Sequence, residues 1–166
     1  VKYLHETVGN LDVNVKDDEG MTAFKCACKN GHVGIVKYLH ETVGITDVNG
    51  VDAYGMTPFM MACEYGHMDI VKYLYETVGN VDVNDEDKNG RTTFMLACKG
   101  GAIDVVKYLY ETIDNVDVNC RVQNVWKAFV MACLAGNANI VKYLNETIGN
   151  LDVTARVGHG RTALMI

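Results

Sequence analysis

The sequence has almost no proline, no long apolar run and no excess of basic residues. A single proline in 166 residues leaves few enforced breaks, which favours a helix-rich chain. No apolar run approaches the roughly 20 residues of a membrane-spanning helix, so we expect no membrane insertion. The 15 basic residues are outnumbered by 21 acidic ones, and the net charge is −6. This balance disfavours a nucleic-acid partner, because basic patches usually contact the phosphate backbone.

What the sequence does contain is a strict repeat. The tetrapeptide Val-Lys-Tyr-Leu recurs every 35 residues, and its copies begin at Val1, Val36, Val71, Val106 and Val141. A fixed period between about 20 and 50 residues is typical of stacked copies of one supersecondary unit. Such an array offers a long surface to a partner rather than an enclosed reaction pocket.

Each copy predicts a turn, a short helix, a second turn, a longer helix and an extended connector. In the copy at 52–86, Gly55 suits the tight turn, Thr57 suits a helix cap and Pro58 suits the first helical position. The full copies are 17–51, 52–86 and 87–121, the copy at 122–156 is degenerate, and partial copies lie at 1–16 and 157–166.

The longer helix of each copy carries an apolar stripe that a stacked neighbour would bury. We therefore expect Leu39, Leu74 and Leu109 in the core. The recurring tyrosine of the tetrapeptide lies in the same stripe and predicts packing rather than a binding surface. Lys37 and Glu41, with their equivalents, are spaced for ion pairs along one helix, each contributing a few tenths of a kcal/mol.

This pattern resembles the ankyrin repeat. The family signature Gly-x-Thr-Pro-Leu-His-x-Ala is visible from Gly55 to Ala62, and the family's Asp-Val-Asn connector recurs at 12–14, 47–49, 82–84 and 117–119. The resemblance implies an all-α ankyrin-repeat solenoid of helix-turn-helix units with short β-turn hairpin fingers. It also implies a non-catalytic protein–protein interaction module or scaffold, which binds through hairpin tips and concave helix surface.

Three departures from the family pattern stand out. The period of 35 exceeds the usual 33, and the two extra residues follow the second helix, where they should enlarge a loop. Lys25 and its equivalents replace the family's histidine, so we expect no buried histidine network. Val125, Trp126 and Lys127 replace Gly-x-Thr, which predicts a distorted turn and a poorly capped helix. Because both ends of residues 1–166 fall within helices and lack a polar cap, we expect an excerpt of a longer array.

The cysteines and histidines show no pattern typical of disulfides, metal sites or catalysis. The recurring column formed by Cys28, Cys63, Cys98 and Cys133 falls at a core position, and neighbouring units stand too far apart for disulfides. Unpaired thiols favour a reducing, cytoplasmic location. The Cys-x3-His pairs lie in separate units, and four convergent ligands are not available, so we predict no metal site. No catalytic motif is present, and we predict no enzyme activity and no cofactor.

The partner-facing positions implied by the resemblance are the hairpin tips, at 18–21, 53–56, 88–91 and 123–126, and the adjacent ends of the first helices. The predicted protein-binding residues at these positions are Tyr54, Met56, Glu64, Tyr65, Lys88, Asn89, Arg91 and Trp126. Five of them, Tyr54, Met56, Tyr65, Arg91 and Trp126, are large aromatic or amphipathic residues of the types enriched at interface hot spots. Scattered surface hydrophobes are the alternative interpretation.

Two other functions remain open at this point. The array is alternatively an architectural component of a large assembly, with many small contacts. It is alternatively the regulatory arm of an enzyme or channel that lies outside this segment. The partner's identity does not follow from the fold.

Overall fold

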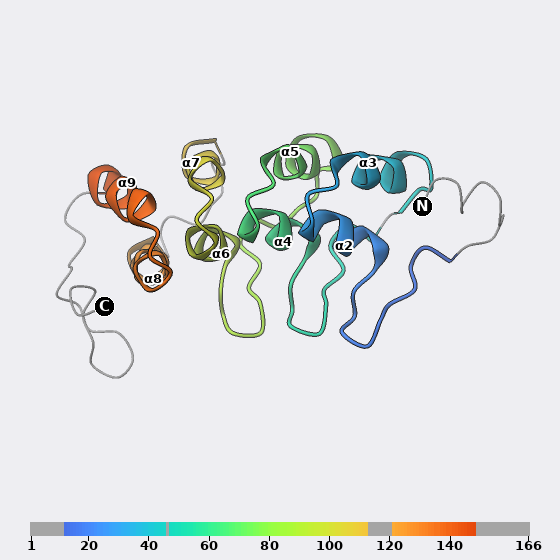
Figure 1. Ribbon diagram of the computed structural model, residues 1–166, viewed down its shortest axis with the longest axis horizontal. Helices are drawn as coiled ribbons and strands as arrows, with labels where there is room; N and C mark the ends of the chain where they lie inside the picture. The colour runs from blue at the N-terminus through green and yellow to red at the C-terminus, as the bar shows by residue number, and fades with distance from the viewer. Residues whose placement is uncertain (1–11, 46, 113–120, 149–166) are drawn as a thin grey trace.

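The computed structural model describes residues 12–45, 47–112 and 121–148. These form two stacked rows of helices with hairpins below the first row (Figure 1). The first row consists of α2 (Ala23–Lys29), α4 (Pro58–Glu64), α6 (Thr93–Gly100) and α8 (Arg121–Leu134). The second row consists of α3 (Val33–Glu41), α5 (Met68–Lys72) with its extension η1 (Tyr73–Val78), α7 (Ile103–Thr112) and α9 (Ala138–Ile148). The described residues contain no strand beyond one isolated bridge between Glu86 and Thr92, so the predicted all-α repeat fold is confirmed.

Three helices of the first row, α2, α4 and α6, begin at threonine caps, as predicted. The amide of Met60 donates to Oγ1 of Thr57 over 3.2 Å, which satisfies one of the free amides at the start of α4. Pro58 occupies the first helical position, where its missing N–H costs nothing. Thr22 and Thr92 cap α2 and α6 in the same way.

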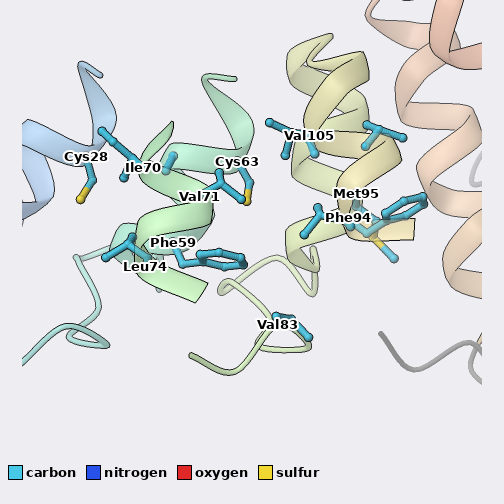
Figure 2. Packing of buried hydrophobic residues seen from close by; sticks show 14 of the residues in the cluster. Cys28, Phe59, Cys63, Ile70, Val71, Leu74, Val83, Phe94, Met95 and Val105 are labelled. Atoms are coloured by element: carbon cyan, nitrogen blue, oxygen red, sulfur yellow. The ribbon is translucent and has the colours of Figure 1, made fainter. Parts of the chain in front are cut away.

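The two rows enclose one continuous apolar core. Leu39, Leu74 and Leu109 are at most 1% exposed, which confirms the predicted stripe. Residues of α5 and η1 pack against side chains of α2 and α4, and Val83 of the connector lies below α6 (Figure 2). Because each unit contributes only part of this core, no unit could bury its apolar face alone.

The array is tighter along the first row. Consecutive first-row helices pack against each other more extensively than consecutive second-row helices do. The stack therefore curves toward the first row and the hairpins, as the arc of helices in Figure 1 shows. This curvature places the hairpins and the ends of the first helices on the inner side.

The two extra residues of the 35-residue unit widen the end of the second helix. In the second unit this helix ends in the π-helical turn η1, and the amide of Gly79 donates to the carbonyl of Leu74 over 3.0 Å. Gly79 and Asn80 then both adopt positive φ, 67° and 57°. The carbonyl of Asn80 accepts a hydrogen bond of 2.7 Å from Nδ2 of Asn49 in the preceding unit. The enlarged loop thus adds a contact between units.

A column of tyrosines joins the second-row helices. The hydroxyl of Tyr73 donates to Oε1 of Glu41 in the preceding unit over 2.9 Å, and Nζ of Lys37 lies 5.2 Å from the centre of the same ring. Tyr108 and Tyr143 have the same relationship to the glutamate and lysine before them. We call this recurring contact the tyrosine ladder, formed by Tyr73, Tyr108 and Tyr143.

The tyrosine ladder corrects the predicted ion pairs along each helix. Lys37 and Glu41 contact Tyr73 of the next unit instead of each other, because the ring offers both a π face and a hydroxyl donor. Among the described residues, the lysine and glutamate of this spacing form an ion pair at Lys142 and Glu146, over 3.9 Å.

The fourth unit differs from the prediction of a distorted turn. Residues 121–134 form one uninterrupted helix, α8, so the segment that forms a hairpin tip in the other units is helical here. The reason is local, since this segment contains neither glycine nor proline to stop a helix. Of the described units, those at 17–51, 52–86 and 87–121 therefore present hairpins, and that at 122–156 does not.

Candidate protein-binding surface

Each hairpin tip is held by a turn aspartate. Oδ1 of Asp52 accepts hydrogen bonds from the amides of Tyr54 and Met56, both over 2.8 Å. Asp17 and Asp87 accept the equivalent amides in the first and third hairpins. These bonds fix the backbone of the tip and leave the two residues after each aspartate at its outermost point.

Main-chain hydrogen bonds join neighbouring tips. The amide of Ala53 donates to the carbonyl of Glu19 over 2.7 Å, and the amide of Lys88 donates to the carbonyl of Tyr54 over 3.0 Å. Gly55 makes this approach possible, because a Cβ there would lie 2.9 Å from the amide nitrogen of Lys88. The three tips therefore form one connected edge, which we call the tip row, made of Asp18, Glu19, Ala53, Tyr54, Lys88 and Asn89.

Three of the predicted binding residues lie exposed in the tip row. The side chain of Tyr54 is 54% exposed, and Lys88 and Asn89 are exposed beside it. An exposed tyrosine ring does not contribute the free energy that its burial would give. Tyr54 is thus available to a partner in a way that packed aromatic residues are not.

Tyr65 and Glu64 lie at the end of α4, on the inner side of the array. Tyr65 is 51% exposed, and Nζ of Lys29 lies 5.7 Å from the centre of its ring. Glu64 pairs with Lys99 of the next unit over 2.7 Å. Gly100, the equivalent of Tyr65, has no side chain, since a Cβ there would collide with the carbonyl of Glu64. Tyr65 is therefore bordered by charged groups on one side and by bare backbone on the other.

Met56 does not reach the surface, and its predicted exposure at a tip is wrong. It is 6% exposed and packs in a second apolar cluster with Met60, Met61 and Leu96, under the hairpins. The amides of Tyr54 and Met56 both donate to Asp52, so the apolar cluster beneath the hairpins, and not the turn, accounts for the burial of Met56.

Arg91 is engaged within its own hairpin. Its Nε and Nη2 both contact Oδ2 of Asp87, at 2.6 and 2.5 Å. Burial alone would raise the pKa of Asp87, but the hydrogen bonds from Arg91 outweigh burial and hold that pKa below its usual value. Arg91 therefore stabilises the third turn, and about a quarter of its side chain remains exposed (27%).

Trp126 does not occupy a tip, because its segment belongs to α8. Its ring stacks on that of Phe129, with centroids 5.8 Å apart and planes 19° apart, and its side chain is half-buried. Packing against the core thus uses much of its surface.

The role of Lys25 was not predicted. Although Lys25 is 2% exposed, its Nζ donates to the carbonyls of Gly20 (2.9 Å) and Val51 (2.7 Å), which links the first hairpin to the second. Burial lowers the pKa of Lys25 from its usual value. The sequence did contain a signal for this role, because Lys25 replaces the family's histidine with another hydrogen-bond donor.

The cysteine column lies in the core. Cys28, Cys63 and Cys98 are fully buried, free thiols, whereas Cys133 is partly buried. Burial raises the pKa of Cys28 to about 12, which leaves it protonated at neutral pH and disfavours a nucleophilic role. The predicted structural role of this column is thus confirmed for its three buried members.

The histidine of the Cys-x3-His pair connects two units. Nε2 of His67 lies 2.9 Å from the carbonyl oxygen of Lys29, and its ring packs over Gly31. In the fourth unit, Nδ2 of Asn137 donates to the carbonyls of Cys98 and Lys99, both over 2.9 Å. In the second and fourth units, this position therefore links a first-row helix to the one before it.

The described residues offer neither a metal centre nor a membrane span. In residues 12–45, 47–112 and 121–148, no group of three or more histidine, cysteine, aspartate or glutamate side chains is arranged to hold a metal ion. No described helix combines the length and hydropathy that crossing a bilayer requires.

Comparison with known proteins identifies the family. The model of a family described as ankyrin repeats (3 copies) matches residues 1–87 and 43–121, which together cover 1–121 of the 166 residues. No curated protein matches the chain. The matched residues contain all three hairpins and the complete tip row. The chain belongs to the ankyrin repeat family.

Proposed function

We propose that this chain binds another protein through the tip row and the inner end of α4, with Tyr54 and Tyr65 at the centre of the contact. Ankyrin repeats generally mediate protein–protein interactions. The observation that carries the proposal is that both tyrosines belong to one unit and are each more than half exposed. Tyrosines of this kind are enriched among the residues that dominate binding energy.

The surroundings of the two tyrosines support the same role. Lys88 and Asn89 lie beside Tyr54 in the tip row. Glu64, which precedes Tyr65, is 15% exposed and pairs with Lys99, which is 43% exposed. An apolar centre with a polar border is the usual composition of an interface. Because the tips are fixed by main-chain bonds, little conformational entropy is lost when a partner binds.

The proposed function is recognition without catalysis, in a reducing compartment such as the cytoplasm. The buried thiols are protonated and packed, and His67 is occupied by a contact between units. The net charge of −6 makes nucleic acid a poor partner. Met56 and Trp126 have no part in this proposal, because packing takes up their side chains.

A matched pair of double variants tests the proposal. The wild-type chain, Tyr54→Ala with Tyr65→Ala, and Thr42→Ala with Thr77→Ala are immobilised and exposed to cell lysate. Thr42 and Thr77 are exposed positions of the second row, so the threonine variant controls for surface substitution. Circular dichroism checks that both variants keep their helical content.

Captured proteins are identified by mass spectrometry, and the affinity of a purified candidate is measured by calorimetry. We expect the tyrosine variant to bind at least about tenfold more weakly, which corresponds to about 1.4 kcal/mol, and the threonine variant to bind like the wild type. Equal affinity of the two variants would remove the tyrosines from the interface. Failure to capture any specific protein would favour an architectural role instead.

A further inference from the structure

The negative charge of the chain is concentrated on its hairpins. The three hairpins with their connectors, which we call the hairpin segments, are 12–22, 47–57 and 82–92. They contain ten acidic residues and three basic ones, a net charge of −7, whereas the rest of the chain contains eleven acidic and twelve basic residues. In the fourth unit, where α8 replaces the hairpin, residues 121–134 contain two basic residues and no acidic one. The excess of acids therefore occurs where hairpins form.

Turn formation explains only part of this excess. Five of the ten acids accept amide hydrogen bonds within their own segments, namely Asp12, Asp17, Asp52, Asp82 and Asp87. Four other carboxylates, which we call the unpaired carboxylates, accept no hydrogen bond and form no ion pair among the described residues, namely those of Asp18, Glu19, Asp85 and Glu86. Their charge has no structural role within the hairpins and is available to a cationic ligand.

The basic residues of the hairpin segments reduce the negative charge without removing it. Arg91 is paired with Asp87 in its own turn. Lys16 is exposed on the first arm of the first hairpin, and Lys88 is exposed at the tip of the third. Because these three bases stand against ten acids, the potential over the hairpins is negative and attracts cations.

Asp85 shows that the acids of the third hairpin segment lack a compensating cation. Its side chain is half-buried, and burial together with the charge of Asp82 raises its pKa. A cation beside a carboxylate has the opposite effect and favours the ionised form. A basic group from a partner would therefore relieve the repulsion between these two acids.

Tyr54, in the middle hairpin, offers a ring that no cation of the described residues covers. Four other tyrosine rings have a lysine Nζ between 5.2 and 5.7 Å from their centres, namely those of Tyr65, Tyr73, Tyr108 and Tyr143. The ring of Tyr54 is exposed instead, and main-chain bonds join its tip to the tips on both sides. A guanidinium suits such a place, because it stacks on an aromatic ring while its N–H groups pair with carboxylates.

We infer that the hairpin segments bind an arginine-containing basic segment of the partner protein, with one guanidinium on the ring of Tyr54 and further basic side chains beside the unpaired carboxylates. This inference deepens the proposed function and rests on it, since it names the chemistry of the partner. Complementary charge selects partners and speeds association more than it adds affinity, so each single charge contributes a modest factor.

Synthetic peptides provide the probes. The test peptide is Gly-Arg-Ser-Arg-Ser-Arg-Gly, and two control peptides replace every arginine by lysine or by glutamate. Binding to the whole chain is measured by calorimetry at about 0.05 M and about 0.3 M salt. We expect the arginine peptide to bind, the lysine peptide to bind more weakly and the glutamate peptide not to bind. Higher salt should weaken binding, because it screens exposed charges.

Two double variants with the same net charge test the location of the site. Glu19→Gln with Glu86→Gln removes two of the unpaired carboxylates and leaves the main chain of the hairpins unchanged. Asp69→Asn with Glu146→Gln, the matched control, removes two exposed carboxylates from second-row helices. We expect the hairpin variant to bind the arginine peptide about three- to tenfold more weakly and the control to stay within about twofold of the wild type. Circular dichroism checks that both keep their helical content.

Two positions test the ring and the opposing charge. Tyr54→Ala should weaken binding of the arginine peptide about two- to fivefold, whereas Tyr54→Phe keeps the ring and should bind within about twofold of the wild type. Lys88→Gln should strengthen binding, because it removes a positive charge from the tip next to Tyr54.

The outcomes separate the two proposals. Equal binding of the arginine and glutamate peptides, or an equal loss in the two double variants, would overturn the inference of a basic partner. If the variant Tyr54→Ala with Tyr65→Ala still loses its captured protein in that case, the proposed function stands without the inference. If this variant keeps its captured protein as well, both proposals fall.

Discussion

The hydroxyl of Tyr108 donates to Oε1 of Glu76 over 2.7 Å, across the boundary between two consecutive repeats. Lys72, one turn before Glu76, stands 5.7 Å from the centre of the same ring. The lysine just before the recurring Tyr-Leu pair and the glutamate two residues after it therefore both contact the tyrosine of the next repeat. This contact gives a physical reason why Lys, Tyr and Glu recur together in every copy.

Replacing Tyr108 by phenylalanine should destabilise the array by about 1 kcal/mol, because the hydrogen bond to Glu76 is lost while the ring and its contact with Lys72 remain. Urea unfolding followed by circular dichroism measures the change. Tyr110→Phe is the control, since the ring of Tyr110 packs between those of Phe94 and Tyr143 and Phe retains that packing. An equal loss in both variants would contradict the role of the hydroxyl.

Replacing Thr93 by valine should stabilise the fold. Its hydroxyl is buried without a hydrogen-bond partner, and its side chain is 1% exposed. A buried unsatisfied hydroxyl costs about 1–3 kcal/mol, and valine has the same shape without it. Thr93→Pro, which copies Pro58 of the preceding unit, should stabilise at least as much, because proline also restricts the unfolded chain. Thermal unfolding measures both, and a lower midpoint for valine would show that the hydroxyl has a partner.

Two glycine-to-alanine substitutions should have opposite effects. Gly100→Ala should destabilise the array, because the new Cβ would collide with the carbonyl of Glu64 and push α6 away from α4. Gly34→Ala in α3 meets nothing within 4 Å and should stabilise by about 0.5–1 kcal/mol through helix propensity. Chemical denaturation of the two variants measures the difference. Similar effects would mean that α6 and α4 are not in close contact.

Replacing Lys25 by methionine, the residue at this position in the next two units, should destabilise the chain by about 1–2 kcal/mol at neutral pH. Two carbonyls, of Gly20 and Val51, lose their donor. The difference from the wild type should grow as pH rises toward 10.5, because the lowered pKa of Lys25 means that the folded chain binds fewer protons than the unfolded one. Denaturation at pH 7 and pH 10 measures this trend, and a shrinking difference would refute it.

Alkaline pH should unfold the array. Burial raises the pKa of Cys28 from 9.0 to about 12, and burial and the contact with Glu41 raise that of Tyr73 from 10.0 to about 12. The stabilisation is complete below pH 9 and is lost as pH rises toward 12, since only the unfolded chain ionises in this window. Melting temperatures between pH 8 and 11 measure the slope. Cys28→Ala should flatten it, whereas the same change at the exposed Cys26 should leave it unaltered.

The repeated features were predictable because each had a local physical cause. Thr57 caps its helix and Leu74 is buried, and both follow from spacing within one unit. The partners of Lys37 and Glu41 were not predictable. Their separation along one helix also suits an ion pair between them. Their contact with Tyr73 depends on how closely the next unit stacks, which the sequence of one unit does not show.

The sequence predicted where the candidate surface lies better than it predicted which of its side chains are exposed. Tyr54 and Met56 both occupy tip positions, yet one is exposed and the other joins a methionine cluster. Which of them turns inward depends on the cluster beneath the hairpins, formed by residues of two units. Trp126 was predicted at a tip because its unit was expected to form a turn. Residues 121–134 contain no helix breaker and form the helix α8 instead.

The bonds between neighbouring tips use backbone atoms alone. Substitutions at Glu19 or Lys88 leave those amides and carbonyls in place, so the tip side chains are able to change while the bonds between the tips remain. If the tip row binds as proposed, its specificity is thus open to change one hairpin at a time, by substitutions that leave the helices beneath it untouched.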